Sequence, residues 1–151
     1  MDFQSNSPKE TIVRETKEGP FTQEIIIGNH VLIADEPIID GGNDAGPSPY
    51  DFLLAALGTC TSMTLRMYAE LKKFPLEKII VKLIHEKIHV DDCAECENTN
   101  SKIDHIERMI ELHGMLSPEQ RRKLLEIANK CPVHRTLTSK ILITTRLLEN
   151  Q

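Results

Sequence analysis

The sequence contains no tryptophan, and aromatic side chains make up only 4% of its 151 residues. A hydrophobic core must therefore be assembled from leucine, isoleucine, valine, methionine and alanine, which suits helices and β-branched strands together. A chain of this length fits one domain over residues 1–151, since a domain of this size buries roughly 70% of its unfolded surface. Residues 1–8 are expected to be loose.

Clusters of basic residues are also missing, because 18 basic side chains are dispersed among 23 acidic ones for a formal net charge of -5. This balance argues against nucleic acids and anionic membranes as partners. No apolar run approaches the ~18 residues that span a bilayer. The first ten residues lack the apolar centre of a secretory signal. We therefore expect a cytoplasmic protein.

In a reducing cytosol, the four cysteines are better explained by reactivity or metal binding than by structural disulfides. Cys60 lies inside a long apolar segment with helix signals. Cys131 follows a second helical pattern and is followed by Pro132. The sequence thus predicts one thiol packed within a helix and one placed where a helix stops.

The order of strand and helix patterns predicts an α+β fold without internal repeats. Gly28 and Asn29 suit the tight turn of a hairpin. The segment 103–112 fits either a helix or a strand by its own periodicity. The predicted elements are strands at 11–16, 21–27 and 30–34, a helix from 49 to about 72, a strand at 76–90, the ambiguous segment 103–112, a helix at 118–129 and a strand at 140–148.

The first half of the long helix is unusual because residues 52–57 are apolar on every side. An amphipathic surface helix would keep one polar face. A second subunit is one way to cover these side chains, which predicts a dimer. The alternative is a central helix wrapped by the sheet of its own chain.

Two segments, 46–60 and 131–137, resemble the two signature regions of the OsmC/Ohr family of osmotically inducible and organic hydroperoxide resistance proteins. The order of elements agrees with that family over nearly the whole chain. The resemblance implies an intertwined homodimer in which two long central helices pack against strongly curved antiparallel sheets. It also implies that segment 103–112 is a strand.

The same resemblance implies a thiol-dependent peroxidase that reduces organic hydroperoxides without a cofactor or a metal. Cys60 would attack the peroxide and become a sulfenic acid, which Cys131 would resolve to a disulfide. A dithiol reductant would then restore both thiols. The simpler interpretation of Cys60 is a small buried hydrophobic residue. The main alternative function is a non-catalytic module of the same fold that senses redox state or binds a small ligand or zinc.

Arg14, Asp51 and Arg135 complete the predicted catalytic set. In the family, an arginine near the first hairpin and a glutamate at the helix start support the thiolate, and Arg14 and Asp51 are the nearest counterparts here. Because Cys60 lies in mid-helix, a nearby cation or hydrogen-bond donor must lower its pKa, with Lys17 as a further option. Asp51 lies nine residues before Cys60, roughly 13 Å along the helix and about 180° around it. Asp51 would therefore act in the partner's site, or only cap its own helix.

Cys93 and Cys96 have the spacing of half a zinc site. No second half is evident, and acidic neighbours would raise the pKa of both thiols. Zinc binding, an auxiliary redox pair and an inert loop all remain open. His134 either lines the peroxide pocket or is a surface residue after the helix.

Overall fold

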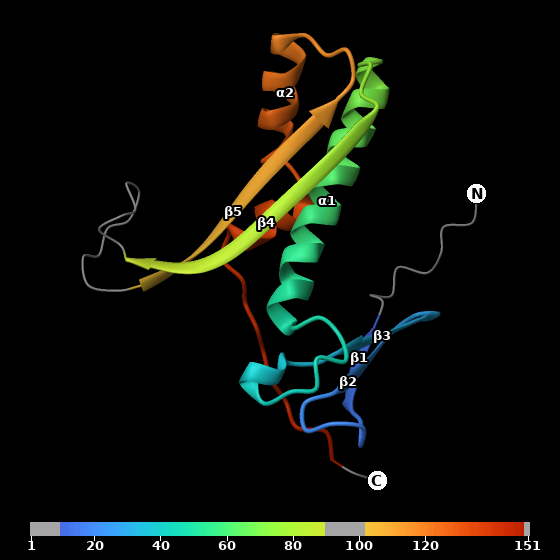
Figure 1. The fold of residues 1–151 in the computed structure, drawn as a ribbon, viewed down its shortest axis with the longest axis vertical. Coiled ribbons are helices and arrows are strands. Elements are labelled where there is room, and N and C mark those ends of the chain that lie inside the picture. The colour runs from blue at the N-terminus through green and yellow to red at the C-terminus, as the bar shows by residue number, and fades with distance from the viewer. Residues whose placement is uncertain (1–9, 90–101, 150–151) are drawn as a thin grey trace. The chain divides into compact units, whose positions relative to one another are not determined.

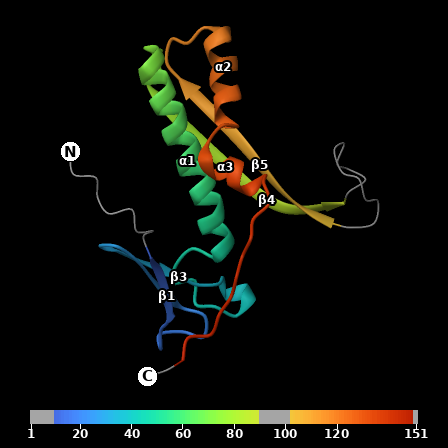
Figure 2. The same cartoon turned by 180° about the vertical axis from the view of Figure 1, so that it is seen from behind.

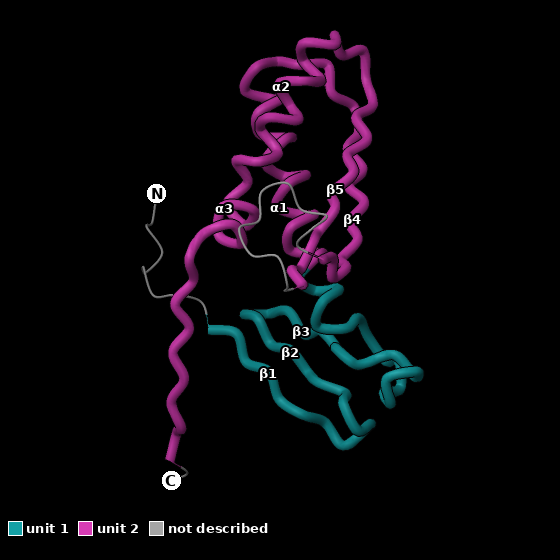
Figure 3. The backbone as a smooth tube through the Cα atoms, turned by 90° about the vertical axis from the view of Figure 1, so that its left-hand side faces the viewer, with its two compact units in different colours: residues 1–53 teal, residues 54–151 magenta. Residues whose placement is uncertain are grey.

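The computed structural model describes residues 10–89 and 102–149, and Figure 1 labels their helices and strands. The chain forms two compact units, residues 1–53 and 54–151, which Figure 3 shows in different colours. Antiparallel strands and helices occupy separate stretches of the sequence, so the predicted α+β class is confirmed.

The first unit contains a three-stranded antiparallel sheet of order β1-β2-β3. Its strands are β1 (Thr11–Glu15), β2 (Gln23–Ile27) and β3 (His30–Ala34), and a short 3-10 helix, η1 (Ile38–Asp40), follows them. The predicted hairpin turn lies between β2 and β3, where Gly28 has a φ of 58°. This left-handed conformation is the reason that glycine suits the position.

The long helix α1 (Pro49–Lys72) has 24 residues, as the sequence predicted, and continues from the first unit into the second. Lys73 adopts a left-handed φ of 56° just beyond its end, and the N–H of Phe74 returns to the Ala69 carbonyl at 2.8 Å. Pro75 then prevents the helix from continuing. None of the described helices is both long and apolar enough to cross a membrane.

The second unit also contains the antiparallel hairpin of β4 (Lys78–His89) and β5 (Lys102–His113), followed by α2 (Pro118–Ala128) and α3 (Pro132–Leu137). In Figures 1 and 2, α1 and α2 run beside this hairpin. Pairing of Val81 with Ile110 lies within an unbroken antiparallel register, so segment 103–112 is a strand. The periodicity alone had not decided this point.

The core of the second unit forms where α1 and α2 meet one face of the hairpin. Leu65 of α1 and Leu124 of α2 are both fully buried there. Strand residues on that face alternate with exposed charged ones, which gives the hairpin a single buried side. The buried cluster consists of Leu65, Ala69, Leu76, Leu116, Leu124, Ile127 and Ala128, with Tyr68, Phe74, Ile79, Ile110 and Leu112 against it.

Helix α2 begins as predicted, with a capping box between Ser117 and Gln120. Helix α3 was not predicted, because Pro132 was interpreted as a stop signal after Cys131. Proline also suits the first position of a helix, where its missing N–H has no partner to lose. Here Pro132 takes that position and Cys131 caps the new helix.

The predicted strand at 140–148 is wrong for the structure described here. Residues 140–149 are exposed and make no backbone hydrogen bond with any other described residue. A strand requires a neighbouring strand to satisfy its N–H and C=O groups. The alternating sequence supplied the side-chain pattern, but the described part of the chain supplies no pairing partner.

Candidate active site

The structure brings Cys60 of α1 and Cys131 at the start of α3 together within the second unit. Both are free thiols, with Cys60 half-buried and Cys131 fully buried. Figure 2 shows α3 beside α1. Hydrogen bonding between the two thiols changes the pKa of each. Two cysteines that are remote in sequence thus form one thiol pair, as the sequence predicted.

The backbone around Cys131 directs an N–H group at its sulfur. Cys131 Sγ accepts a hydrogen bond from the backbone N–H of His134 at 3.4 Å. The cysteine N–H itself bonds to the Ala128 carbonyl at the end of α2, also at 3.4 Å. The sulfur is therefore the capping acceptor of α3, in the place where Ser or Asp usually stands.

The two thiols have pKa shifts of opposite direction. Burial raises the pKa of Cys60 most, the N–H of Val133 partly offsets this, and the hydrogen bond to Cys131 raises the pKa again. Burial also acts to raise the pKa of Cys131, but hydrogen bonds from His134, Cys60 and Thr61 outweigh it and lower the pKa. The two thiols therefore titrate as an interacting pair, in which ionisation of one affects the other.

Arg108 is a polar residue at this site that the sequence interpretation missed. Its guanidinium donates to Thr61 Oγ1 and to Asn129 Oδ1, each at 2.9 Å. Burial lowers the pKa of Arg108 and the charge of Cys131 raises it, but an arginine stays protonated. The sequence did contain a signal for Arg108. If segment 103–112 is a strand, Arg108 shares its apolar face with Ile106 and Ile110.

Two hollows adjoin this site, and both are lined by Leu57, Ile106 and His134. The first, of about 280 Å³, also has Arg108, Ile110, Leu125 and Asn129 in its wall. The second, of about 220 Å³, is completed by Asp104, Leu137 and Thr138. A larger hollow of about 540 Å³ beside α2 has a mostly charged and polar wall. Both hollows next to the thiol-bearing segments thus have walls of mixed apolar and polar side chains, and neither thiol lines them.

His134 contributes to the site through both its backbone and its ring. Its N–H caps the sulfur, and its side chain lines both hollows. Burial lowers the pKa of His134, and the positive charge of Arg108 lowers it further. The ring is therefore neutral at pH 7, and of the two interpretations of His134 the structure agrees with the one that places it at a pocket.

With this geometry in view, comparison with known proteins decides the family. The family described as OsmC-like protein matches residues 41–146 of the chain. The protein belongs to the OsmC-like family. No match was found among curated protein sequences.

Solved structures of OsmC/Ohr proteins have the same fold at low sequence identity. An OsmC-like protein from Mycoplasma pneumoniae is 16% identical with a TM-score of 0.67, over 88% of this chain and 89% of that one. An organic hydroperoxide resistance protein OsmC from Legionella pneumophila is 16% identical with a TM-score of 0.64, over 89% and 92%. One from Elizabethkingia anophelis, with bound thiocyanate, is 16% identical with a TM-score of 0.64, over 89% and 91%.

Arg14 and Asp51 of this OsmC-like chain lie in the first unit, where each has a local partner. Arg14 on β1 pairs with Glu24 on β2. Asp51 accepts hydrogen bonds from the N–H and the hydroxyl of Ser48 at 2.9 and 2.8 Å, and these bonds lower its pKa. Asp51 thus caps α1, and roles of Arg14 and Asp51 at the thiols stay predictions.

Arg135, the remaining predicted site residue, is exposed on α3. It lines a surface hollow with Pro132, Thr136 and Ser139, separate from the hollows that His134 lines. Its predicted role at the thiols also stays a prediction. Within the second unit, the described residues around the thiol pair include Thr61, Arg108 and His134.

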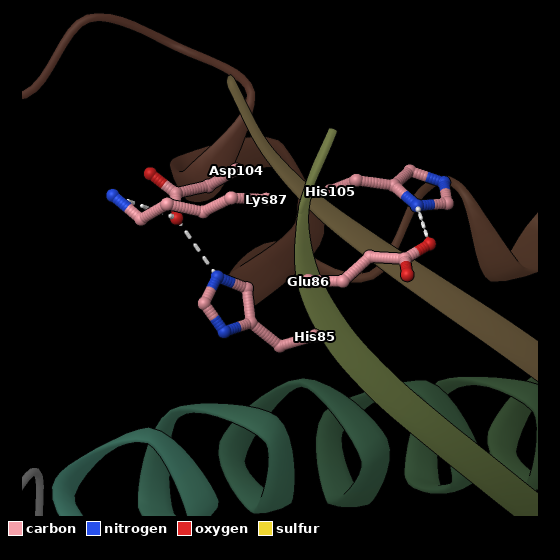
Figure 4. Close-up of polar contacts among 5 residues, drawn as sticks. All are labelled: His85, Glu86, Lys87, Asp104 and His105. Carbon is pink, nitrogen blue, oxygen red and sulfur yellow. Dashed lines mark hydrogen bonds and ion pairs between the residues drawn. The ribbon is translucent and has the colours of Figure 1, made fainter. Parts of the chain in front are cut away.

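Other ionisable side chains occupy the β4–β5 hairpin of this OsmC-like protein, where they form cross-strand pairs (Figure 4). His85 Nε2 lies 2.8 Å from Asp104 Oδ1, and Lys87 Nζ lies 3.8 Å from the same atom. His105 Nδ1 lies 3.2 Å from Glu86 Oε1. The bond from His85 is the main cause that lowers the pKa of Asp104. These pairs link the two strands.

The possible zinc site at Cys93 and Cys96 lies outside the described residues. Within residues 10–89 and 102–149, no group of three or more His, Cys, Asp or Glu side chains is placed to hold a metal ion. The three interpretations of that cysteine pair therefore stay open.

Proposed function

We propose that this OsmC-like protein is a thiol-dependent peroxidase that reduces organic hydroperoxides with Cys60 and Cys131. The observation that carries the proposal is the interaction of two free thiols near a hollow whose wall includes four apolar side chains. Cys60 is the more exposed of the two and is the thiol that a peroxide can reach. Cys131 is placed to react with whatever forms on Cys60.

The chemistry follows from these positions. The Cys60 thiolate attacks one peroxide oxygen, the O–O bond breaks, and the alkoxide leaves and takes a proton to become an alcohol. Cys60 is then a sulfenic acid. The Cys131 thiolate attacks the sulfenic sulfur, expels hydroxide, which is protonated to water, and forms a disulfide. A dithiol reductant returns the disulfide to two thiols.

The wall of the hollow supports an organic hydroperoxide as the substrate class. Leu57, Ile106, Ile110 and Leu125 offer apolar contact to a hydrocarbon group. Hydrogen peroxide has no such group and would gain nothing from these contacts. Some relatives of the same fold are described as organic hydroperoxide resistance proteins, which agrees with this substrate class.

We also propose that the protein acts in the cytoplasm as an intertwined homodimer, with both units forming one OsmC-like domain over residues 1–151. Met63, Met67 and Leu71 of α1 are 65, 71 and 76% exposed, which leaves an apolar face on the central helix. The segment 140–149 also exposes large apolar side chains, including Leu142. A second copy would cover both, and Asp51 would then act in the site of the partner subunit.

The test is consumption of cumene hydroperoxide by the purified chain with a dithiol such as dihydrolipoamide. Cys60→Ser should abolish turnover, whereas Cys131→Ser should allow one turnover and leave a sulfenic acid that dimedone labels. Cys93→Ser with Cys96→Ser is the matched control and should retain turnover. Stoichiometric disulfide formation without turnover would instead favour a redox sensor. Absence of any peroxide loss with every dithiol tried would end the peroxidase proposal.

A further inference from the structure

The two hollows near the thiols share one side and differ in charge. Leu57, Ile106 and His134 line both of them. Arg108 lines the hollow of about 280 Å³, whereas Asp104 lines the hollow of about 220 Å³. His134 is neutral at pH 7, because burial and the charge of Arg108 lower its pKa. The two hollows together therefore have a cation at one end, a carboxylate at the other and apolar side chains between them.

A single strand sets the distance between these two charges. Asp104, Ile106 and Arg108 lie on the same face of β5, because side chains alternate along a strand. Four residues of strand place the Cα atoms of Asp104 and Arg108 about 13 Å apart, with Ile106 between them. An extended peptide of about four residues spans the same distance. The separation of the charges thus suits a short peptide better than a single amino acid.

Both charged groups are able to bind a ligand. Arg108 is in no ion pair within residues 10–89 and 102–149, and its hydrogen bonds go to neutral oxygens. Asp104 is ionised, since a hydrogen bond from His85 lowers its pKa. That bond of 2.8 Å and the approach of Lys87 Nζ at 3.8 Å both involve Oδ1, and no described residue bonds to Oδ2 (Figure 4). Lys87 lies beyond hydrogen-bond distance and is exposed, so it neutralises Asp104 only in part.

The side that the hollows share lies next to the reactive turn of α1. Leu57 precedes Cys60 by three residues and is therefore its neighbour on the helix surface. The Leu57 carbonyl also accepts a hydrogen bond from the hydroxyl of Thr61 at 2.7 Å. A ligand that fills both hollows thus brings its middle, rather than its charged ends, closest to Cys60.

We propose that the two hollows together bind a short peptide hydroperoxide, with its carboxylate at Arg108, its ammonium at Asp104 and an oxidised apolar side chain near Leu57. This proposal rests on the proposed function, whose substrate class it names. The Cys60 sulfur takes the outer peroxide oxygen and becomes a sulfenic acid while the O–O bond breaks. The alkoxide on the peptide takes the proton that Cys60 released, so the product is the same peptide with a hydroxylated side chain.

The test compares four forms of one peptide hydroperoxide, prepared by irradiating Gly-Leu-Gly in oxygenated water. The peptide has both ends free, an acetylated amino end, an amidated carboxyl end, or both ends blocked, so only the terminal charges differ. With the wild-type chain and dihydrolipoamide, kcat/KM should be about 5-fold higher for the free peptide than for the doubly blocked one, mainly through KM. Equal values for all four forms would overturn the proposal.

Each charged residue should control one end of the peptide. Asp104→Asn should abolish the gain in kcat/KM from a free ammonium and keep the gain from a free carboxylate. Arg108→Gln should do the reverse, and Arg108→Lys should behave as the wild type. Because each gain is a ratio measured within one variant, a general change of activity does not alter it. An Asp104→Asn chain with the wild-type ammonium gain would overturn the proposal, even if Arg108→Gln does not fold.

Matched controls remove the same charges outside the two hollows. Glu107→Gln removes a carboxylate from the other face of β5, and Arg122→Gln removes a guanidinium from α2. Both variants should keep both gains. A loss of either gain in these controls would assign the preference to net charge and overturn the site.

Binding without peroxide separates this proposal from the proposed function. In a nuclear magnetic resonance titration of the reduced chain, unoxidised Gly-Leu-Gly should bind with a dissociation constant about 5-fold lower than that of the doubly blocked peptide. This preference without any peroxide consumption would refute the peroxidase and leave the peptide site intact. Peroxide consumption without binding of either peptide, or without a charge preference, would refute the peptide site and leave the peroxidase intact.

Discussion

The second unit uses arginine in two different ways at its two ends. At the end where α1 meets β4, Arg66 donates to the carbonyls of Leu76 and Glu77 at 2.6 and 3.0 Å, beside a core in which Leu65 is fully buried. At the end that holds the thiols, Arg108 donates to side chains and adjoins two hollows. The first arginine satisfies loop carbonyls, whereas the second lies beside reactive groups.

This difference separates interactions that stabilise the fold from interactions that change the protonation of the thiols. Arginine bonded to backbone carbonyls stabilises a turn, and its effect is local and structural. An arginine without a carboxylate partner beside an acidic thiol also shifts a protonation equilibrium. The two ends should therefore respond differently when they are altered. Substitutions at the core end should lower the free energy of unfolding, and substitutions at the thiol end should shift the pKa of a cysteine.

The largest expected effect lies at the core end. Leu124→Ala removes a fully buried side chain and leaves a cavity, so the free energy of unfolding should fall by about 2–5 kcal/mol. Leu125→Ala, at a neighbouring position that is 59% exposed, should cost less than about 1 kcal/mol. Urea unfolding followed by circular dichroism gives both values. Equal losses for the two variants would contradict the assignment of the core to one face of α2.

A smaller loss of stability is expected at Thr61, which is buried and also interacts with the thiol site. Its hydroxyl donates to the Leu57 carbonyl at 2.7 Å and accepts from Arg108, while its interaction with Cys131 lowers the pKa of that thiol. Because Thr61 has one hydroxyl proton, Leu57 and the Cys131 sulfur compete for it.

Thr61→Val keeps the shape but removes this proton and the acceptor for Arg108. Stability should fall by about 1–2 kcal/mol, and the Cys131 titration should move to higher pH. Thermal unfolding and ultraviolet titration report the two effects. Thr59→Val, at an exposed position on the same helix, is the control and should leave the titration in place. A titration that is equally unmoved in Thr61→Val would contradict the proposed part of Thr61.

The smallest expected effect concerns His134. Its folded pKa lies below its unfolded value, so the unfolded chain binds more protons in the range between them. Its contribution to stability is therefore complete above the unfolded value of about 6.5 and is lost as pH falls below it. Unfolding measured from pH 5 to 8 should show this slope in the wild type and a weaker slope in His134→Gln. If both proteins show the same dependence of unfolding free energy on pH, that dependence arises from groups other than His134.

The sequence predicted most of the fold because strong local signals coincide with the final structure. Pro49 begins and Pro75 ends the long helix, and Ser117 with Gln120 opens α2. Segment 103–112 was different, because its own periodicity fits two structures and only pairing with β4 selects one. The segment 140–148 failed for the related reason that a strand depends on a partner that local sequence does not contain.

At the site, sequence predicted the two cysteines and left His134 open between a pocket position and a surface position. Arg108 was missed because it lies on a strand far from both cysteines in sequence, and only the fold brings it close to them. The lowered pKa of Cys131 was also beyond sequence reasoning. It depends on burial and on N–H directions at the start of α3, which exist only after folding.

The sulfur that starts α3 has a consequence for what oxidation does to the backbone. As a thiolate, Cys131 is a strong acceptor for the amide of His134, whereas a disulfide sulfur is neutral and accepts weakly. Closing the disulfide should loosen the first turn of a six-residue segment. Faster hydrogen exchange at the His134 amide in the oxidised chain would show this loosening, and an unchanged exchange rate would exclude it. The oxidation state of the two cysteines could then be measured from the hydrogen-exchange protection of the backbone.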